Sequence, residues 1–151
     1  MKLSTRGRYG LKAMVDLAVA YGSGTVSTSA LAAQQGISDA YLEQIITSLR
    51  KAGLVRAVRG AQGGNTLTRA PEEMNVGEIL RALEGSTDLV ECVSSDHVDC
   101  DNACTCSARP LWLKLQSKIN AVLNETSLAD MAEDYKIQKN RMKGEEDASI
   151  S

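Results

Sequence analysis

Two helical patterns meet at a four-residue turn, QGIS, at residues 35–38, and this junction constrains the fold more than any other stretch. A small residue, Ala32, stands four positions before Gly36, and an apolar residue, Leu42, stands six positions after it. This spacing predicts a helix-turn-helix, because the helices cross at a small side chain, the glycine permits a sharp turn and the apolar residue enters the core. Ordinary helical hairpins share the pattern, so the flanking segments must distinguish a helix-turn-helix from such a hairpin.

Three helices are predicted before residue 54. Each begins at a hydroxyl residue that can cap it and ends at glycine, which readily adopts a left-handed backbone. Their apolar residues recur every three or four positions, as on one face of a helix. The caps are Ser4 or Thr5, Ser27 or Thr28, and Ser38; the final glycines are Gly22 and Gly24, Gly36, and Gly53; the inward positions are Leu11, Met14, Val15, Ala18 and Tyr21, then Leu31, Ala32 and Ala33, then Leu42, Ile45, Ile46, Leu49 and Ala52.

A β-hairpin is predicted directly after the third helix. The stretch LVRAVRG alternates apolar and basic residues like a strand, GAQGG is a flexible turn, and NTLT returns as a second short strand. A helix-turn-helix followed by a hairpin is a winged helix. Arg59 falls at the tip of the wing, where it suits a phosphate or a narrow minor groove.

Charge is divided unevenly along the chain. Residues 1–70 hold nine Lys or Arg against three acids, a balance of +6, whereas the remainder holds eight basic and sixteen acidic residues, a balance of −8. A basic part joined to an acidic part favours a polyanion, such as double-stranded DNA, as the partner of the first.

The third predicted helix carries polar residues opposite its apolar stripe. Glutamine can bond adenine bidentately, glutamate can accept from cytosine, and tyrosine or serine can bond phosphate or base, so this face can read a major groove. A solvated polar face is the alternative interpretation. The residues are Asp39, Tyr41, Glu43, Gln44, Thr47, Ser48 and Lys51.

The acidic part predicts two further helices with different roles. Asn75 caps the first, which Gly85 ends, and Pro110 suits the first turn of a long second one. Apolar residues of the long helix recur at intervals of three, four and three residues, as in a coiled-coil seam. Since one winged helix has a small footprint on DNA, we interpret the seam as a homodimer interface that serves a two-fold operator, with packing inside one chain as the alternative. The inward residues are Val76, Ile79, Leu80 and Leu83 in the first helix and Trp112, Leu115, Ile119 and Val122 in the second.

Four cysteines and the single histidine, His97, fall in a segment without helical or strand periodicity. No signal peptide or membrane span is predicted, so we expect a cytoplasmic protein whose thiols stay reduced. That setting favours metal binding or redox chemistry over a structural disulfide. The cysteines are Cys92, Cys100, Cys104 and Cys106.

The expected fold is therefore mainly α, with a winged helix-turn-helix domain, a cysteine-bearing loop and a long C-terminal dimerisation helix. No base and nucleophile pair indicates an enzyme. The expected divisions are a winged helix-turn-helix over 1–70, a connecting helix over 71–90, a cysteine-rich loop over 91–109, a dimerisation helix and short terminal helix over 110–136, and a disordered tail over 137–151.

Six blocks in order resemble the iron-sulfur cluster regulator (IscR-like) family of dimeric winged-helix transcription factors: MKLSTRGRYGLKAMVDLA, QGISDAYLEQIITSLRKAGLV, VRGAQGG, VGEILRALEG, CSARPLW and TSLADM. The resemblance implies that the loop cysteines hold an iron-sulfur cluster, as in members that sense iron, cluster status, nitric oxide or redox state. One departure is Asn65, where relatives often have an aromatic residue. The residues implied to contact DNA are Ser38, Tyr41, Glu43, Gln44 and Arg59.

Alignment with the family's three cysteines selects Cys92, Cys100 and Cys106 and leaves Cys104 as an additional thiol. Where many relatives have a ligating histidine, this chain has Arg109, which cannot bind iron. We therefore expect Cys104 to complete a 2Fe-2S cluster. His97 and the nearby acids are the alternative fourth ligands; these acids are Glu91, Asp96, Asp99 and Asp101. A 4Fe-4S cluster, a zinc site that includes His97 and a thiol-disulfide switch are the alternatives.

The expected function is a cluster-sensing transcriptional regulator, a repressor by type, that controls cluster-assembly or related genes. Within the same family, the alternatives are a regulator of cysteine or sulfur metabolism, a nitric oxide responder and a zinc-stabilised repressor. An alternative from another functional class is an electron carrier or a cluster-handling protein. In such a protein the basic residues of the segment 1–70 would have no role.

Overall fold

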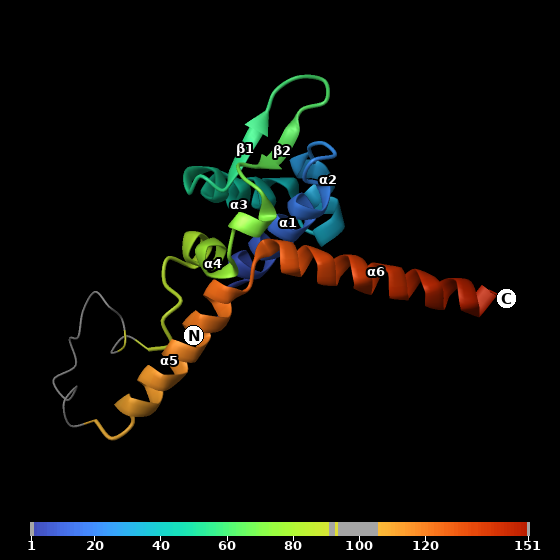
Figure 1. The fold of residues 1–151 in the computed structure, drawn as a ribbon. Helices are drawn as coiled ribbons and strands as arrows, with labels where there is room; N and C mark the ends of the chain where they lie inside the picture. Colours follow the sequence, from blue (N-terminus) through green and yellow to red (C-terminus); the bar gives the residue numbers. More distant parts are fainter. Residues whose placement is uncertain (1, 91–92, 94–105, 151) are drawn as a thin grey trace.

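The computed structural model describes residues 2–90, 93 and 106–150 (Figure 1). Within these ranges helices dominate, and a single two-stranded sheet forms the wing. The helices α5 and α6 leave the compact N-terminal part in different directions. The elements are α1 (Thr5–Ala20), α2 (Thr28–Gln35), α3 (Asp39–Lys51), β1 (Val55–Val58), β2 (Gly64–Leu67), the 3-10 turn η1 (Pro71–Glu73), α4 (Val76–Glu84), α5 (Arg109–Glu125) and α6 (Leu128–Ile150).

Serine hydroxyls start the first three helices. The side chains of Ser4, Ser27 and Ser38 accept hydrogen bonds from the N–H groups of Gly7, Ala30 and Tyr41, each at 3.1 Å. Each bond satisfies one of the N–H groups that have no partner inside the helix. Ser27, and not Thr28, is therefore the cap of α2, and the Thr28 hydroxyl is available for another contact.

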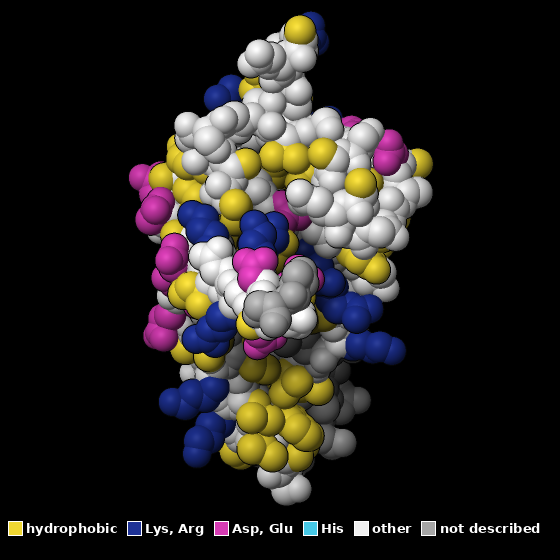
Figure 2. Space-filling model, turned by 90° about the vertical axis from the view of Figure 1, so that its right-hand side faces the viewer, with side chains coloured by type: hydrophobic (Ala, Val, Ile, Leu, Met, Phe, Trp, Pro, Cys, Tyr) yellow, Lys and Arg dark blue, Asp and Glu magenta, His cyan; other side chains and the backbone are white. Residues whose placement is uncertain are grey.

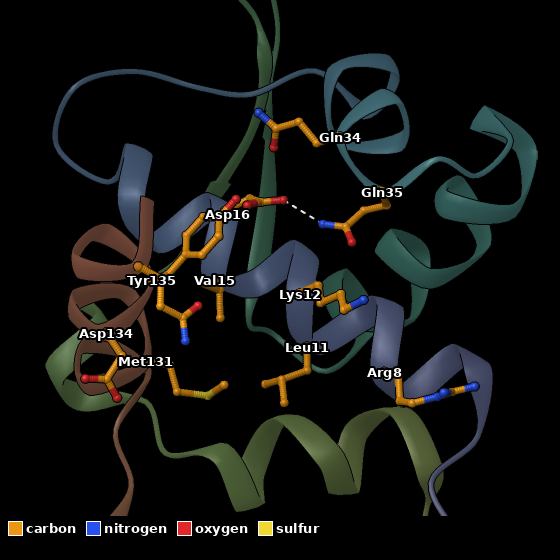
Figure 3. Close-up of a pocket in the computed structure, with 11 residues that line it drawn as sticks. Arg8, Leu11, Lys12, Val15, Asp16, Gln34, Gln35, Met131, Asp134 and Tyr135 are labelled. Atoms are coloured by element: carbon orange, nitrogen blue, oxygen red, sulfur yellow. Dashed lines mark hydrogen bonds between the residues drawn. The ribbon is translucent and has the colours of Figure 1, made fainter. Parts of the chain in front are cut away.

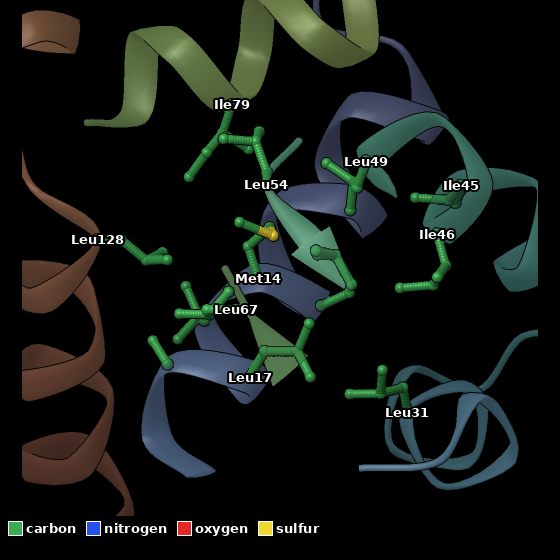
Figure 4. Close-up of a cluster of buried hydrophobic side chains, with 14 of the residues drawn as sticks. Met14, Leu17, Leu31, Ile45, Ile46, Leu49, Leu54, Leu67, Ile79 and Leu128 are labelled. Carbon is green, nitrogen blue, oxygen red and sulfur yellow. The ribbon is translucent and has the colours of Figure 1, made fainter. Parts of the chain in front are cut away.

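The core forms where α1, α3, α4 and the wing meet (Figure 4). The predicted stripes of α3 and α4 are buried from Leu42 to Leu49 and from Val76 to Leu83. The α1 stripe differs, because this helix packs against neighbours on several sides. Its most buried side chains include Ala13 and Leu17, whereas Tyr21 follows the helix and is 41% exposed.

The wing is an antiparallel hairpin in the register Val55↔Leu67 to Val58↔Gly64. Two backbone hydrogen bonds join Val26 to Asn65, from Val26 N–H at 3.0 Å and from Asn65 N–H at 2.8 Å. These bonds fasten β2, close to the wing turn, to the segment that leads into α2. The predicted helix-turn-helix and wing are thereby confirmed.

A carboxylate joins the start of α1 to the end of α4. Glu84 Oε1 accepts from the Ser4 N–H at 3.0 Å and from the Ser4 hydroxyl at 2.7 Å. The helices are so close here that a Cβ on Gly10 would lie 2.4 Å from a Leu83 methyl group. The winged helix and the connecting helix α4 are therefore one packed unit.

The C-terminal end differs from the expected short helix and disordered tail, because α6 is one continuous helix over Leu128–Ile150. Its first turns enter the core through Leu128 and Ala132, which are 0% and 5% exposed. Once packing has nucleated a helix, each further residue adds a hydrogen bond, and the proline-free tail consists largely of good helix formers. The low hydrophobicity that suggested disorder does not prevent this extension. In the described ranges, no helix is long and apolar enough to cross a membrane.

Candidate functional site

The helix α3 presents a polar face away from the core. Its buried residues are Leu42, Ile45, Ile46 and Leu49. At 100° per residue, the face opposite these positions is centred on residues 40, 44, 47 and 51. Ala40, Gln44 and Lys51 are exposed and Thr47 is half-buried. This face carries the groups that the sequence suggested for major-groove contacts.

The structure brings most of the predicted DNA-contacting residues onto α3 and places the remaining one on the wing. Ser38 is exposed at the start of α3, where its hydroxyl is already engaged in the cap. Tyr41 is half-buried, and its ring meets the edge of Tyr9 at 6.4 Å between centroids. Gln44 is exposed, and Arg59 is exposed at the start of the wing turn. Gln44 and Arg59 are therefore the freest of these side chains to meet a ligand.

Glu43 is held at the edge of the polar face. Its Oε1 accepts from Arg50 Nη2 at 2.9 Å, and its Oε2 accepts from the Thr28 hydroxyl at 3.1 Å. The Arg50 and Glu43 side chains are 33% and 47% exposed, so this ion pair contributes only about 0–1 kcal/mol to stability. The contacts orient the carboxylate more than they stabilise the fold.

Sequence reasoning missed one basic residue beside this face. The Arg6 guanidinium, from the first turns of α1, donates to the Ser48 hydroxyl on α3. Arg6 is exposed, so it adds a cation to the flank of the polar face. The cluster of basic residues in the first decapeptide was the available signal, but only the packing of α1 against α3 shows where it lies.

Both ends of the cysteine segment lead to α5. On the entry side, the buried Gln116 of α5 donates from Nε2 to the Thr87 carbonyl at 3.2 Å and accepts from the Leu89 N–H. On the exit side, Cys106 lies just before the first turn of α5. The residues that precede and follow the cysteine segment are thus both connected to α5.

Of the four candidate thiolate ligands, only Cys106 lies in the described part of the chain. It is half-buried and forms no disulfide there. Arg109 opens α5, and its guanidinium cannot ligate a metal. The other candidates, Cys92, Cys100, Cys104 and His97, lie outside the described residues. Residues 2–90, 93 and 106–150 by themselves bring together no group of three or more potential metal ligands.

Apolar residues of α5 remain uncovered. Leu111, Leu115 and Val122 are 53%, 39% and 62% exposed. Figure 2 shows hydrophobic side chains gathered over the lower part of the molecule, where α5 lies. Of the described α5 residues, Gln116 alone is buried. Of the four predicted seam residues, Leu115 and Val122 are therefore exposed, and Trp112 and Ile119 are half-buried.

A separate hollow of about 710 Å³ lies between α1, the end of α2 and the first turns of α6 (Figure 3). In its wall, Asp16 accepts a hydrogen bond from Gln35 at 2.7 Å. Burial raises the pKa of the Asp16 carboxyl, although the Gln35 bond and the charge of Lys139 act in the opposite direction.

Replacing Asp16 by asparagine is expected to stabilise the protein at neutral pH. The raised pKa means that the fold favours the protonated carboxyl, so the ionised group costs stability above that pKa and the cost is relieved as pH falls through it. Asparagine removes the charge and keeps an acceptor for Gln35. The gap in unfolding midpoint between D16N and the unmodified protein should shrink from pH 7 to pH 4. A gap independent of pH would contradict the assignment.

The helix-turn-helix, the exposed polar helix and the wing define a winged-helix DNA-binding protein. The sequence matches the Rrf2 family, described as an iron-dependent transcriptional regulator, over residues 3–134. The chain belongs to this family, whose members are transcriptional regulators and not enzymes.

Relatives of two kinds resemble the chain to a similar degree. The transcriptional regulator CymR of Bacillus subtilis is 39% identical over 132 residues, which cover 87% of this chain and 90% of CymR. The transcriptional regulator IscR of Aliivibrio salmonicida is 38% identical over 139 residues, which cover 92% of this chain and 82% of IscR. The structure of B. subtilis CymR, the global cysteine regulator, superposes with a TM-score of 0.75 at 40% identity, over 88% of this chain and 97% of CymR. The structure of T. potens IscR superposes with a TM-score of 0.70 at 42% identity, over 89% of this chain and 88% of that IscR chain.

Proposed function

We propose that this protein is a homodimeric regulator that binds a two-fold operator in double-stranded DNA and senses iron-sulfur cluster, iron or redox status through a 2Fe-2S cluster. The observation that carries the proposal is that both flanks of the four-cysteine segment are connected to α5, the helix on which Leu115 and Val122 are exposed. A change in the loop can thereby reach the dimer interface, and through it the spacing of the two α3 helices. Cluster-assembly or related genes are the proposed targets.

The proposed ligands are Cys92, Cys100, Cys104 and Cys106. Soft thiolates converging from an irregular loop suit an iron-sulfur cluster, since the loop can adapt its spacing to the metal. When bound, the cluster would supply a one-electron redox centre. The protein's own part is to hold the loop on Gln116 and to leave Cys106 accessible before α5.

The proposed DNA contacts come from α3 and the wing. Gln44 and Glu43 read base edges, Ser38 and Tyr41 contact the backbone or bases near the start of α3, and Arg59 binds phosphate or a minor groove. The exposure of Gln44 and Arg59 supports this division of roles.

A regulator of cysteine or sulfur metabolism is the second candidate. The likeness to CymR, itself described as a global cysteine regulator, favours it. Such a regulator, sensing through a protein partner, would have no need of four loop cysteines. The two candidates therefore differ in whether the isolated protein carries a metal centre.

Anaerobic purification of the full chain tests the proposal. We expect a visible absorption spectrum with iron and acid-labile sulfide in about equal amounts, two of each per chain, as a 2Fe-2S cluster requires. Stoichiometric zinc without sulfide would select the zinc-stabilised alternative. Protein without metal, even after reconstitution with iron and sulfide, would favour the second candidate.

Replacing Arg59 by alanine is expected to weaken binding to all DNA sequences alike. Each phosphate contact releases counterions, so the variant should lower the slope of log affinity against log salt by about one. Binding titrations at several salt concentrations measure the slope. Arg81, an exposed arginine on α4 that donates to Asn124 on α5, provides a control, because R81A removes the same charge outside the proposed interface. An unchanged slope in R59A would remove Arg59 from the interface.

A further inference from the structure

A buried amide lies on β2, next to the strand pair that leads into the wing turn. Asn65 of β2 is 3% exposed, and its Nδ2 donates to the Val26 carbonyl at 3.2 Å and to the Thr28 hydroxyl at 3.1 Å. Its backbone also pairs with Val26. Asn65 therefore shares four hydrogen bonds with the segment that enters α2, two from its side-chain amide and two from its backbone. Thr28 is the member of this group that faces α3.

The Thr28 hydroxyl links the Asn65 side chain to α3, the helix proposed to read DNA. Because its oxygen accepts from Asn65, its single proton is free to point to Glu43, whose Oε2 lies at 3.1 Å. Arg50 Nη2 holds the other carboxylate oxygen at 2.9 Å. A continuous chain of side chains thus runs from β2 through the start of α2 to α3, and it ends on Glu43 at the edge of the polar face.

The held carboxylate can still accept a further bond. An ionised carboxylate has about four lone-pair positions, and the described residues engage two of those on Glu43. The side chain is also 47% exposed. Its contacts therefore restrict the rotamer without blocking access, which is how a polar group is preorganised for a partner.

We propose that Thr28 and Asn65 are positioning residues that set the base preference of α3 by holding the Glu43 carboxylate, although neither is part of the DNA-contacting face. This inference rests on the proposed function, in which α3 reads DNA. The wing then has a second role besides carrying Arg59. A substitution there alters which operator is chosen, and it acts through Glu43.

The experiment begins with selection of duplexes from a random pool by the full-length protein, followed by competition binding with singly substituted operators and random DNA. The E43A variant should lose a preference of about 5- to 150-fold at the base pair that Glu43 reads. The T28V variant keeps the shape of threonine but removes the hydroxyl, and it should weaken the same preference by about 2- to 10-fold. N65A should also weaken this preference. T28S keeps the hydroxyl, so it should show the preference of the unmodified protein.

Two matched comparisons separate positioning from a general loss of structure. Ser29 donates to Asp39 at 2.7 Å, so S29A removes another side-chain bond between α2 and α3 that does not involve Glu43, and it should leave the preference unchanged. In an E43A background, T28V should have no further effect on the preference. Unfolding midpoints show that the variants compared are folded.

Three outcomes would overturn the inference: T28V with the unmodified preference, T28V and E43A effects that simply add, or an equal loss in S29A. If E43A and the unmodified protein select the same operator, Glu43 reads no base and the inference also fails. Failure of the proposed function looks different, since the unmodified protein would then select no common sequence at all.

Discussion

In the proposed homodimer, replacing Val122 by glutamate is expected to separate the two protomers and to lower the affinity for a two-fold operator by about 10²- to 10⁴-fold. In a two-fold interface the new charge lies on both copies of the same apolar seam, where it is removed from water without a partner. Each monomer then binds its half-site independently and loses the high effective concentration that the second half-site provides.

The monomeric fold should tolerate this change, because Val122 is 62% exposed within one chain. Light scattering and operator titration measure the two effects, and the unfolding midpoint at low concentration checks the fold. Ser117 is also exposed on α5 but points away from the seam, so S117E adds the same charge as a control. A dimeric V122E protein would show that α5 does not join the protomers.

Replacing Cys104 by serine is expected to make the cluster labile and to shift its visible spectrum and reduction potential, whereas H97A should do little. Thiolate is the softest donor available in the loop, and Arg109 cannot serve in its place. All-thiolate ligation leaves more negative charge on the cluster than neutral imidazole does. We therefore expect a potential nearer the plant-ferredoxin value of about −400 mV than the Rieske range.

Spectra and redox titration of anaerobically purified variants test this ligand assignment. C106S provides the reference for complete loss, because Cys106 is one of the three cysteines that match the family pattern. A Cys104 variant with an unmodified spectrum would show that its thiol is not a ligand. A large effect of H97A, together with a small effect of C104S, would identify His97 as the fourth ligand.

The local features of the fold could be read from residues close together in sequence. Ser38 caps α3 and Asn75 caps α4 because each side chain reaches an N–H three residues ahead, and Gly36 ends α2 with a left-handed backbone at φ 68°. The stripe from Leu42 to Leu49 is buried because its spacing matches the helical period. These features depend on contacts within a few residues, so they do not require knowledge of the tertiary arrangement.

Packing between distant segments decided the rest. The sequence suggested Glu43 as a base-reading acid, but nothing near it in sequence indicates which residues hold it. Thr28, which bonds Glu43, is 15 residues away from it, and Asn65, which bonds Thr28, is 37 residues away from Thr28. The anchoring of the cysteine loop by Gln116 is likewise a contact between segments 27 and 29 residues apart. The end of the chain was expected to be disordered, yet α6 begins at the buried Leu128 and continues to Ile150. In each case a local pattern names the groups available, while long-range packing selects their partners, because only folding brings those partners within hydrogen-bonding or van der Waals distance.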